Sequence, residues 1–395
     1  MKVTPLMDFT RTPEQDMLID TASKVGSKFG LEYWREKDAA KAYPHELWQA
    51  ICDAGLCAIA VPEEYGGAGL GILELAMAVE ALCAGGGGST LSQLYMLSPI
   101  FGGVTLAKYG SPEQKRLLPG LADGSVQFCM ALTEPDAGSN ALNISSFARA
   151  DGKGWRLNGQ KIWITSVGQA QKMLVVCRTQ ATSEVAHKTD GISLFLIDTD
   201  RAGLEHTPID KAGTCTLPSS AVFFDDVEVQ PDELVGTLHG GFYELLDTLN
   251  TERIVTASGL IGTVDLALRL AVDYAKDRKV FGGKPIGSYQ ALQFPLAEAH
   301  IMSECARLMN YKAASLHDAG RPYGSEANQA KWLAGHACSQ ATDRAMQTLG
   351  GMGYAKEYHL ERLWRDARLF RFAPVSEEMV LNYVAQHDLG LPRSY

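Results

Sequence analysis

A single carboxylate interrupts an apolar face of a predicted helix. One side of that helix carries four residues spaced by 4, 3 and 4 positions, namely Leu245, Leu249, Glu252 and Thr256. The two leucines indicate that this side faces the core, so Glu252 faces inward with them. Removing a carboxylate from water costs free energy, which makes Glu252 a candidate acid–base group. A tolerated polar residue on a partly exposed face, or half of a structural ion pair, would give the same pattern.

Hydroxyl groups lie in a turn-rich segment in the middle of the chain. In MALTEPDAGSN, residues 130–140, Thr133 and Ser139 carry hydroxyls, while Pro135 and Gly138 favour turns. Free backbone N–H groups in such a loop can approach a polar ligand closely. A strand that simply ends in a turn explains the same residues, and for this segment alone it is the better explanation.

An aromatic residue and a hydroxyl alternate with isoleucines in KIWITS, residues 161–166. Alternation along a strand predicts that Trp163 and Thr165 share one face and that the flanking isoleucines share the other. An indole beside a hydroxyl could stack on a flat aromatic ligand and hydrogen-bond to it. A tryptophan packed in the core is the ordinary alternative.

Two further groups of residues stand at the ends of predicted helices. Arg278, Phe281 and Gln290 surround a helix break in YAKDRKVFGGKPIGSYQALQF. An arginine at a helix C-terminus usually satisfies the last carbonyls, but it could equally bind a diphosphate. In MQTLGGMGY, residues 346–354, glycines follow an apolar helix, which is typical of a C-cap and a turn.

Three stretches of different character must position these groups. Helix signals dominate residues 1–125, strand signals dominate 126–235, and helical spacing returns over 236–395. The last stretch predicts a bundle of long helices over residues 241–276, 287–317, 323–350 and 357–371. The predicted class is α+β and mostly α, with an N-terminal helical domain, a small, mainly antiparallel β domain and a C-terminal four-helix bundle.

Glycines give two local predictions. Asn158-Gly159 lies between alternating segments of WRLNGQKIWITS and predicts a β-hairpin turn. The glycine-rich stretches 63–71 and 83–90 lack the features of nucleotide-binding loops, so we expect them to connect helices.

The composition limits the classes of function. The 395 residues are 46% apolar and 21% charged, as in ordinary globular proteins. The net charge of -10, without any run of Lys and Arg, argues against a nucleic-acid partner. Apolar runs stay below the ~20 residues of a membrane span, and the N-terminus lacks the apolar core of a signal peptide. The eight cysteines are scattered without metal-ligand spacing, so we expect reduced thiols, no metal site and a cytoplasmic location.

The motifs occur together in an order that is typical of one enzyme family. They are TEP-AGS, WIT, R-x-x-F with a following Gln, and Q-x-L-GG-G-Y, and RLWRDAR (362–368) is a further segment of this kind. In this combination the chain resembles the acyl-CoA dehydrogenase family over essentially its whole length. The resemblance implies one FAD per subunit between the β domain and the C-terminal bundle. It also implies a homo-oligomer, a dimer or a tetramer, in which a neighbouring subunit completes the site.

The resemblance further implies which residues contact the cofactor. Along the flavin and its diphosphate we expect Met130, Leu132, Thr133 and Ser139, and against the isoalloxazine Trp163 and Thr165. From across a subunit contact, the diphosphate and adenosine would be held by Arg278, Phe281, Gln290, Gln347, Gly350 and Gly351. Ser376 would lie near the cofactor, because it matches a family threonine.

The reaction of the family is the α,β-dehydrogenation of an acyl thioester, with electrons passed on to an electron-transfer flavoprotein. A carboxylate whose pKa is raised by desolvation removes the α-proton while a hydride leaves the β-carbon. In many members this base lies in a YEGT motif, whose position here is Pro374. In a branch that resembles isovaleryl-CoA dehydrogenase the base lies in an LxxER motif, here residues 249–253. The resemblance therefore implies that Glu252 is the base and that the substrate contacts are Ser139, Leu249, Asn250 and Arg253.

The chain departs from the family pattern at three places. Pro374 has no backbone N–H, whereas in the family that N–H helps to polarise the thioester carbonyl. Either Val375 or the flavin ribityl hydroxyl would then serve, or the substrate is held differently. Asp136 and Asn140 replace the usual Gly and Asp, and the spacing from Arg278 to Gln290 is one residue longer than usual.

Two other functions stay open from the sequence. A flavoenzyme of the same fold could be an enoyl-CoA reductase or a monooxygenase, and the SEEM segment resembles the ending of reductase-like members. A non-catalytic thioester-binding subunit would also explain Pro374. Coenzyme A and another pantetheine carrier fit the sequence equally.

Overall fold

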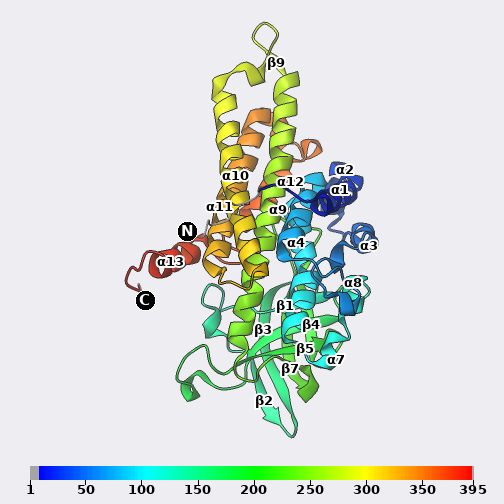
Figure 1. Cartoon of the computed structure of the whole chain (residues 1–395), viewed down its shortest axis with the longest axis vertical. Coiled ribbons are helices and arrows are strands. Elements are labelled where there is room, and N and C mark those ends of the chain that lie inside the picture. Colours follow the sequence, from blue (N-terminus) through cyan, green and yellow to red (C-terminus); the bar gives the residue numbers. More distant parts are fainter. Residues whose placement is uncertain (1–8, 394–395) are drawn as a thin grey trace, which may run out of the picture.

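The computed structural model describes residues 9–393, whose arrangement Figure 1 shows. Long helices form the upper part of the molecule, a β-sheet lies below them, and the N-terminal helices cover one side. Residues 1–8 and 394–395, the outermost ends of the predicted first and last domains, lie outside the described residues.

The N-terminal part consists of helices that begin at the predicted caps. The Gln15 N–H donates to Thr12 Oγ1 at 3.2 Å, and the Thr12 N–H donates to Gln15 Oε1 at 3.1 Å. Ser111 caps α7 in the same way. Residues 83–87 form a π-helical turn between α4 and α5, so this glycine-rich stretch connects helices, as predicted. The helices are α1 (Pro13–Lys28), α2 (Leu31–Ala40), α3 (His45–Asp53), α4 (Ile72–Leu82), α5 (Ser89–Met96), α6 (Thr105–Tyr109), α7 (Pro112–Lys115) and α8 (Leu118–Ala122).

The middle part forms a sheet in which antiparallel pairs predominate, as predicted. Neighbouring strands follow the order β6-β7-β3-β2-β4-β5-β8, and β1 pairs with β4 in parallel. The strands are β1 (Phe128–Ala131), β2 (Phe147–Asp151), β3 (Gly154–Thr165), β4 (Lys172–Arg178), β5 (Ile192–Asp198), β6 (Leu204–Ile209), β7 (Ser219–Val229) and β8 (Leu234–Val235).

The hairpin predicted at Asn158-Gly159 is wrong. Strand β3 continues through both residues, and Gly159 lies opposite Phe224 of β7 beside a β-bulge. The turn between β2 and β3 lies at residues 152–153 instead, where Gly152 has a φ of 60°. Gly159 serves a close approach of two chain segments, because a Cβ at this position would lie 2.4 Å from Ser146 Oγ.

Three long helices packed side by side dominate the C-terminal part. They begin and end close to the predicted segments, and two shorter helices follow. Small residues let α9 approach the N-terminal helices, since a Cβ on Gly262 would lie 2.4 Å from the carbonyl oxygen of Glu80. The elements are α9 (Gly241–Asp277), β9 (Lys279–Val280), β10 (Lys284–Pro285), α10 (Gln290–Asp318), α11 (Gly324–Leu349), α12 (Leu360–Leu369) and α13 (Glu377–His387). The small hairpin β9–β10 forms the tip of the bundle (Figure 1).

A buried aspartate joins the three parts of the chain. Asp366 of α12 is 1% exposed and accepts a hydrogen bond from Thr90 Oγ1 of α5 at 2.7 Å. It also accepts from the N–H of Thr214, which lies between β6 and β7, at 2.6 Å. Arg362 completes the group, with NH1 3.5 Å from the aspartate. The RLWRDAR segment therefore fixes how the helical parts sit on the sheet.

Helix α9 is long and apolar enough to cross a membrane by length and composition alone. However, 83% of its most apolar stretch is buried inside the protein, as expected for the central helix of a packed core.

Candidate active site

Glu252 lies on the inward face of α9, as its spacing predicts. Glu252 is only 5% exposed, and Leu245, two helical turns earlier, is 1% exposed. Leu245 and Leu249 belong to an apolar cluster that also contains Met130 and Leu132 of the β domain. The carboxylate therefore lies just beyond the point where α9 leaves the sheet and enters the bundle.

The surroundings of Glu252 raise its proton affinity. Burial raises the pKa of Glu252 to about 7, while the positive charges of Arg253 and Lys331 act in the opposite direction. Within residues 9–393 this carboxylate makes no hydrogen bond and no ion pair. A carboxyl group in this state can take up or release a proton near neutral pH.

The predicted substrate contacts on α9 lie within one helical turn of Glu252. Arg253 NH1 donates a hydrogen bond to Asn250 Oδ1, and Leu249 packs toward the β domain. Burial lowers the pKa of Arg253, but a guanidinium remains charged at neutral pH. Its Nε has no hydrogen-bond partner among the described residues. Arg253 is thus a buried cation beside Glu252 that is only partly satisfied by the protein.

The segment that contains Pro374 is connected to this region through a buried lysine. Lys331 of α11 is 0% exposed, and its Nζ donates a hydrogen bond to the carbonyl oxygen of Val375. The next residue, Ser376, caps α13, because its Oγ accepts from the Met379 N–H at 3.3 Å. Sequence reasoning did not identify Lys331. The sequence does contain an indication that Lys331 is buried, because it lies at helical spacing between two alanines of the buried face, four residues after Ala327 and three before Ala334.

On the β-domain side, a second buried lysine holds the end of β1. Lys161 Nζ lies 2.8 Å from Glu134 Oε1 and donates to the carbonyl oxygen of Leu132 at 2.9 Å. The neighbouring residue Thr133 accepts from the N–H of Ile162 at 2.8 Å. These bonds place Met130, Leu132 and Thr133 beside the strand that carries Trp163. The pair Glu134–Lys161 was also missed, although a lysine inside an apolar strand is an unusual residue there.

The simple alternation predicted for KIWITS is wrong at Trp163. The pairing of β3 with β7 shifts register between Lys161 and Ile164, and Trp163 has a φ of 64°. This bulge leaves the indole 53% exposed, whereas Thr165 is buried with its Oγ1 3.4 Å from Ser219 Oγ. The extra residue therefore turns the tryptophan out of the sheet core, where it presents its ring to a potential ligand.

The loop after β1 is open to ligands. Ser139 is exposed, and a Cβ added to Gly138 would meet no atom within 4 Å. Glu134 closes the loop by accepting from the N–H groups of Ser145 at 2.6 Å and Ser146 at 3.0 Å. The loop is therefore fixed at its base and accessible at its tip.

The remaining predicted cofactor residues lie far from Glu252. Arg278 ends α9 at the tip of the bundle, Phe281 in the tip hairpin is 90% exposed, and Gln290 begins α10. The last turn of α11 carries Gln347, and Gly350 and Gly351 follow it. Along α9, Glu252 and Arg278 are separated by about 39 Å. A single chain therefore does not bring these residues together with Glu252, Met130 and Trp163.

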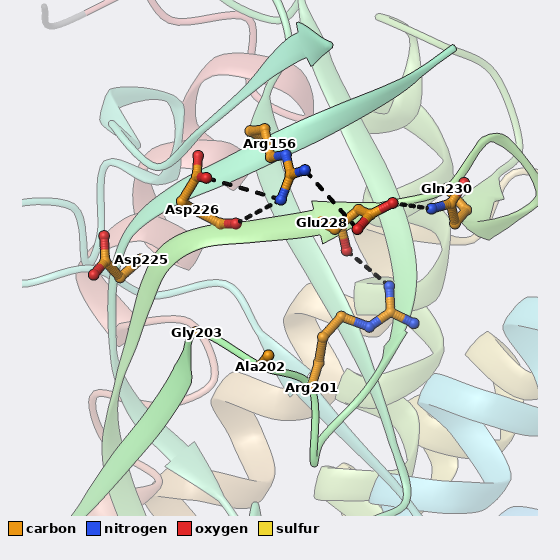
Figure 2. A pocket seen from close by; sticks show the side chains of 8 residues that line it. All are labelled: Arg156, Arg201, Ala202, Gly203, Asp225, Asp226, Glu228 and Gln230. Atoms are coloured by element: carbon orange, nitrogen blue, oxygen red, sulfur yellow. Dashed lines mark hydrogen bonds and ion pairs between the residues drawn. The ribbon is translucent and has the colours of Figure 1, made fainter. Parts of the chain in front are cut away.

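A hollow on the β domain, drawn in Figure 2, has a different character. It has a volume of about 490 Å³ and lies between the ends of β3 and β7. Its arginines are engaged in ion pairs, with Arg156 Nε 2.9 Å from Asp151 Oδ2 and Arg201 NH2 bound to Glu233. In Figure 2, Arg156 points toward Asp226 and Glu228, and Arg201 points toward the backbone carbonyl oxygen of Glu228. Both cations of this surface are engaged in ion pairs, and its lining offers no group for acid–base chemistry comparable to Glu252.

All three parts of the chain match models of one enzyme family. The N-terminal domain of acyl-CoA dehydrogenase matches residues 12–125, the middle domain residues 129–227 and the C-terminal domain residues 239–389. The chain belongs to the acyl-CoA dehydrogenase family. Members of this family are FAD-dependent oxidoreductases, and the solved structures that resemble this chain include FAD complexes. The family predicted from the motifs is therefore confirmed.

Similar proteins match almost the whole length of the chain. Acyl-CoA dehydrogenase FadE12 of Mycobacterium tuberculosis is 42% identical over 392 residues, which are 98% of this chain and 99% of that protein. A 3-(aryl)acrylate reductase of Clostridium sporogenes is 32% identical and covers 90% of this chain and 93% of its own. The structure of a glutaryl-coenzyme A dehydrogenase with glutaryl-CoA has a TM-score of 0.93 at 30% identity and covers 98% of both chains. The predicted fold, with its helical domain, β domain and helical bundle, is confirmed.

Proposed function

We propose that this chain dehydrogenates an acyl-CoA thioester to the 2-enoyl thioester, with Glu252 as the base that removes the α-proton. The observation that carries this proposal is the Glu252 carboxylate. It is buried, its pKa is raised to about 7, and it forms no hydrogen bond or ion pair with any of residues 9–393. A base is most effective when its pKa lies near the working pH and its lone pairs are free for the substrate.

The proton passes from the α-carbon to a carboxylate oxygen of Glu252. Before the transfer, Arg253 and Lys331 favour the ionised form of this carboxylate. After it, the same two cations stabilise negative charge that develops on the thioester. Leu249 and Met130 pack against an apolar cluster at this end of the site, and such a lining disfavours water beside the base. When bound, FAD supplies the acceptor for the hydride that leaves the β-carbon, so the substrate loses two hydrogens and gains a C=C bond.

The groups on the β-domain side fit a flavin. The indole of Trp163 is exposed and can stack on a flat ring. The open loop at Gly138 lets a polar ligand approach the backbone closely. We propose that the ring system and diphosphate are contacted by Met130, Leu132, Thr133, Ser139, Trp163, Thr165 and Ser376. We also propose Ser139 as a substrate contact, together with Leu249, Asn250 and Arg253.

A homo-oligomer completes the site in this proposal. Because Arg278 lies about 39 Å along α9 from Glu252, the tip residues serve the cofactor of a neighbouring subunit. Those residues are Arg278, Phe281, Gln290, Gln347, Gly350 and Gly351. Helix α10 supports such an association with a stripe of exposed apolar side chains at seven-residue spacing: Phe294 is 56% exposed, Ile301 61% and Leu308 55%. A dimer or tetramer should therefore be seen by sedimentation at the concentrations used for assay.

Electrons leave the proposed enzyme through an electron-transfer flavoprotein in a reducing cytoplasm. The eight cysteines are all unpaired, which is the state expected in such a compartment.

The decisive experiment is anaerobic reduction of the bound flavin. The purified protein should be yellow, and one member of a panel of acyl-CoA thioesters should bleach it. The Glu252→Gln variant should keep the flavin and lose the bleaching, because a neutral amide cannot take the α-proton. Glu244→Gln, a substitution of a partly buried carboxylate on the same helix, is the matched control and should bleach normally. Full bleaching by Glu252→Gln would exclude it as the base, and a colourless protein that binds CoA esters would indicate a non-catalytic subunit.

The reverse reaction is a second candidate, and the similarity to a 3-(aryl)acrylate reductase favours it. In that direction Glu252 would give its proton to the α-carbon of an enoyl thioester. Reduced enzyme mixed anaerobically with a 2-enoyl-CoA distinguishes the two, because a reductase should be reoxidised faster by the enoyl thioester than it is reduced by the saturated one. Rapid reoxidation by oxygen with a hydroxylated product would indicate a monooxygenase instead.

A further inference from the structure

Lys331 is a buried cation at the meeting point of three helices. Lys331 is 0% exposed and lies on α11, a helix that packs against α9. Among the charged groups around it, Glu377 at the start of α13 acts on it most strongly, followed by Arg253 and Glu252 of α9 and by Arg371, which precedes α13. Burying an ammonium group costs free energy, so its presence here requires compensating interactions.

The direct partner of Lys331 is uncharged. Its Nζ donates to the carbonyl oxygen of Val375, and no carboxylate of the described residues lies within ion-pair distance of it. Glu377 is compensated by other groups, since its Oε2 lies 3.2 Å from His336 Nε2 and its Oε1 pairs with Arg371. The carboxylate near Lys331 that lacks any bonded partner of its own is Glu252.

We propose that Lys331 is a positioning residue for the reaction: its hydrogen bond holds Val375 in place, and its buried positive charge acts on the Glu252 carboxylate across the contact between α11 and α9. This inference rests on the proposed role of Glu252 as the base. It assigns two separable tasks to one side chain: a hydrogen bond that fixes residues 373–376 against α11, and a positive charge that stabilises the Glu252 carboxylate.

The two tasks have different consequences. Removing the charge should raise the pKa of Glu252, because an opposite charge nearby favours the ionised form. The charge of Arg253 remains in either case, so the effect should be a shift and not a loss of ionisation. Burial also lowers the pKa of Lys331 to about 8. Above that pH a growing fraction of the wild-type lysine is neutral, so the difference from a charge-free variant should become smaller.

The test compares Lys331→Met, Lys331→Gln and Lys331→Arg as FAD-bound enzymes. The rate of anaerobic flavin reduction is measured from pH 5.5 to pH 9.5, with Lys312→Met as a control because Lys312 lies 3.0 Å from Glu326 at the surface. We expect the midpoint of the Met and Gln profiles to rise by about one pH unit, which lowers the rate near pH 7 about fivefold. Lys331→Arg should restore the wild-type midpoint, and Lys312→Met should not change it. Gln can still donate to Val375, so it separates the charge from the hydrogen bond.

A second readout does not depend on turnover. The infrared C=O stretch of a protonated carboxylic acid, assigned to Glu252 by its absence in Glu252→Gln, can be titrated in each variant. If Glu252 is not the base, flavin reduction will not follow this titration, but the titration will still show whether Lys331 shifts it. Unchanged midpoints in both measurements for Lys331→Met and Lys331→Gln would overturn the inference. If Lys331→Met does not fold, Lys331→Gln and Lys331→Arg decide the question between them.

Discussion

Two buried regions of this molecule each contain a lysine and a glutamate, but the two glutamates differ in whether they are hydrogen-bonded. In the β domain, Lys161 Nζ lies 2.8 Å from Glu134 Oε1, and Glu134 also accepts from two backbone N–H groups. In the bundle, Lys331 bonds to the carbonyl oxygen of Val375 and leaves Glu252 without a bonded partner among the described residues. The first carboxylate is fully engaged, whereas the second has only charged neighbours.

The difference is visible in their proton affinities. Burial acts to raise the pKa of both groups, but at Glu134 the charge of Lys161 and the hydrogen bonds prevail and lower the pKa to about 2. At Glu252 burial prevails, and the pKa rises to about 7. A carboxylate with direct hydrogen bonds and an ion pair, such as Glu134, thus stabilises the fold. A carboxylate that has only nearby charges, such as Glu252, keeps its oxygens available for proton transfer.

The largest effect on stability is expected at Glu134. Glu134→Gln leaves Lys161 as a buried cation without its counter-charge, which should cost about 3–5 kcal/mol of unfolding free energy. Urea unfolding at pH 7 measures this loss. Lys161→Met in the same background should recover part of it, because it removes the uncompensated cation. An equally unstable double variant would show that the loop after β1, and not the charge, is what the pair supports.

Shortening the free carboxylate should affect the rate instead of the stability. Glu252→Asp withdraws the base from the substrate by one methylene, and a displacement of about 1 Å typically lowers a rate about 100-fold. Stopped-flow reduction of the flavin measures the rate, and urea unfolding should change little. The matched Glu134→Asp variant should show the reverse result, with lower stability and a nearly unchanged rate in the folded enzyme.

The two carboxylates should also give stability opposite dependences on pH. The native pKa of Glu252 lies above its ordinary value of 4.5, so its ionisation makes folding less favourable as the pH rises from about 4.5 to about 7. Glu252→Gln should therefore be more stable than wild type at pH 8 by on the order of 2 kcal/mol, and equal at pH 4. The native pKa of Glu134 is lowered, so its contribution is present at neutral pH and is lost as the pH falls from about 4.5 toward 2. Equal stability of Glu252→Gln and wild type at pH 8 would contradict the raised pKa.

The smallest effect is expected at the indole that faces the proposed cofactor. Trp163→Leu keeps an apolar side chain but loses the flat ring, which should weaken FAD binding about tenfold. Titration of the deflavinated protein with FAD, followed by fluorescence quenching, gives the dissociation constant. Trp155→Leu is a control of the same type, since Trp155 packs on Phe195 inside the sheet and should affect stability more than FAD affinity.

The sequence was sufficient to predict the architecture and the inward position of Glu252. Both follow from local periodicity: leucines at helical spacing identified the buried face of α9, and cap residues such as Thr12 marked where helices begin. Local patterns, a turn signal in one case and strand alternation in the other, also produced the two errors. Asn158-Gly159 and the alternation around Trp163 were interpreted without knowing that β3 carries two register shifts against β7. Those shifts depend on contacts with Ser146 and β7, which no short window of sequence contains.

The partners of the charged groups could not be predicted for the same reason. Glu134 and Lys161 are 27 residues apart in sequence, and Lys331 and Val375 are 44 residues apart. A buried charge can be suspected from its apolar surroundings, but whether it is bonded or free depends on what the fold brings next to it. This distinction separates Glu134 from Glu252, and it is set by the three-dimensional fold.

Helix α9 fixes both the distance and the relative rotation between two of its residues, Glu252 and Arg278. It carries Glu252 in its first half and ends at Arg278, so in the proposed oligomer one rigid rod carries the base of one active site and a cofactor contact of the next. Inserting one residue between them would rotate the two ends by about 100° relative to each other and lengthen the rod by about 1.5 Å. A seven-residue insertion would nearly restore the rotation but displace the tip by about 10 Å. The active sites of two neighbouring subunits would thus both depend on the same helix, and an insertion or deletion between Glu252 and Arg278 would misalign both sites.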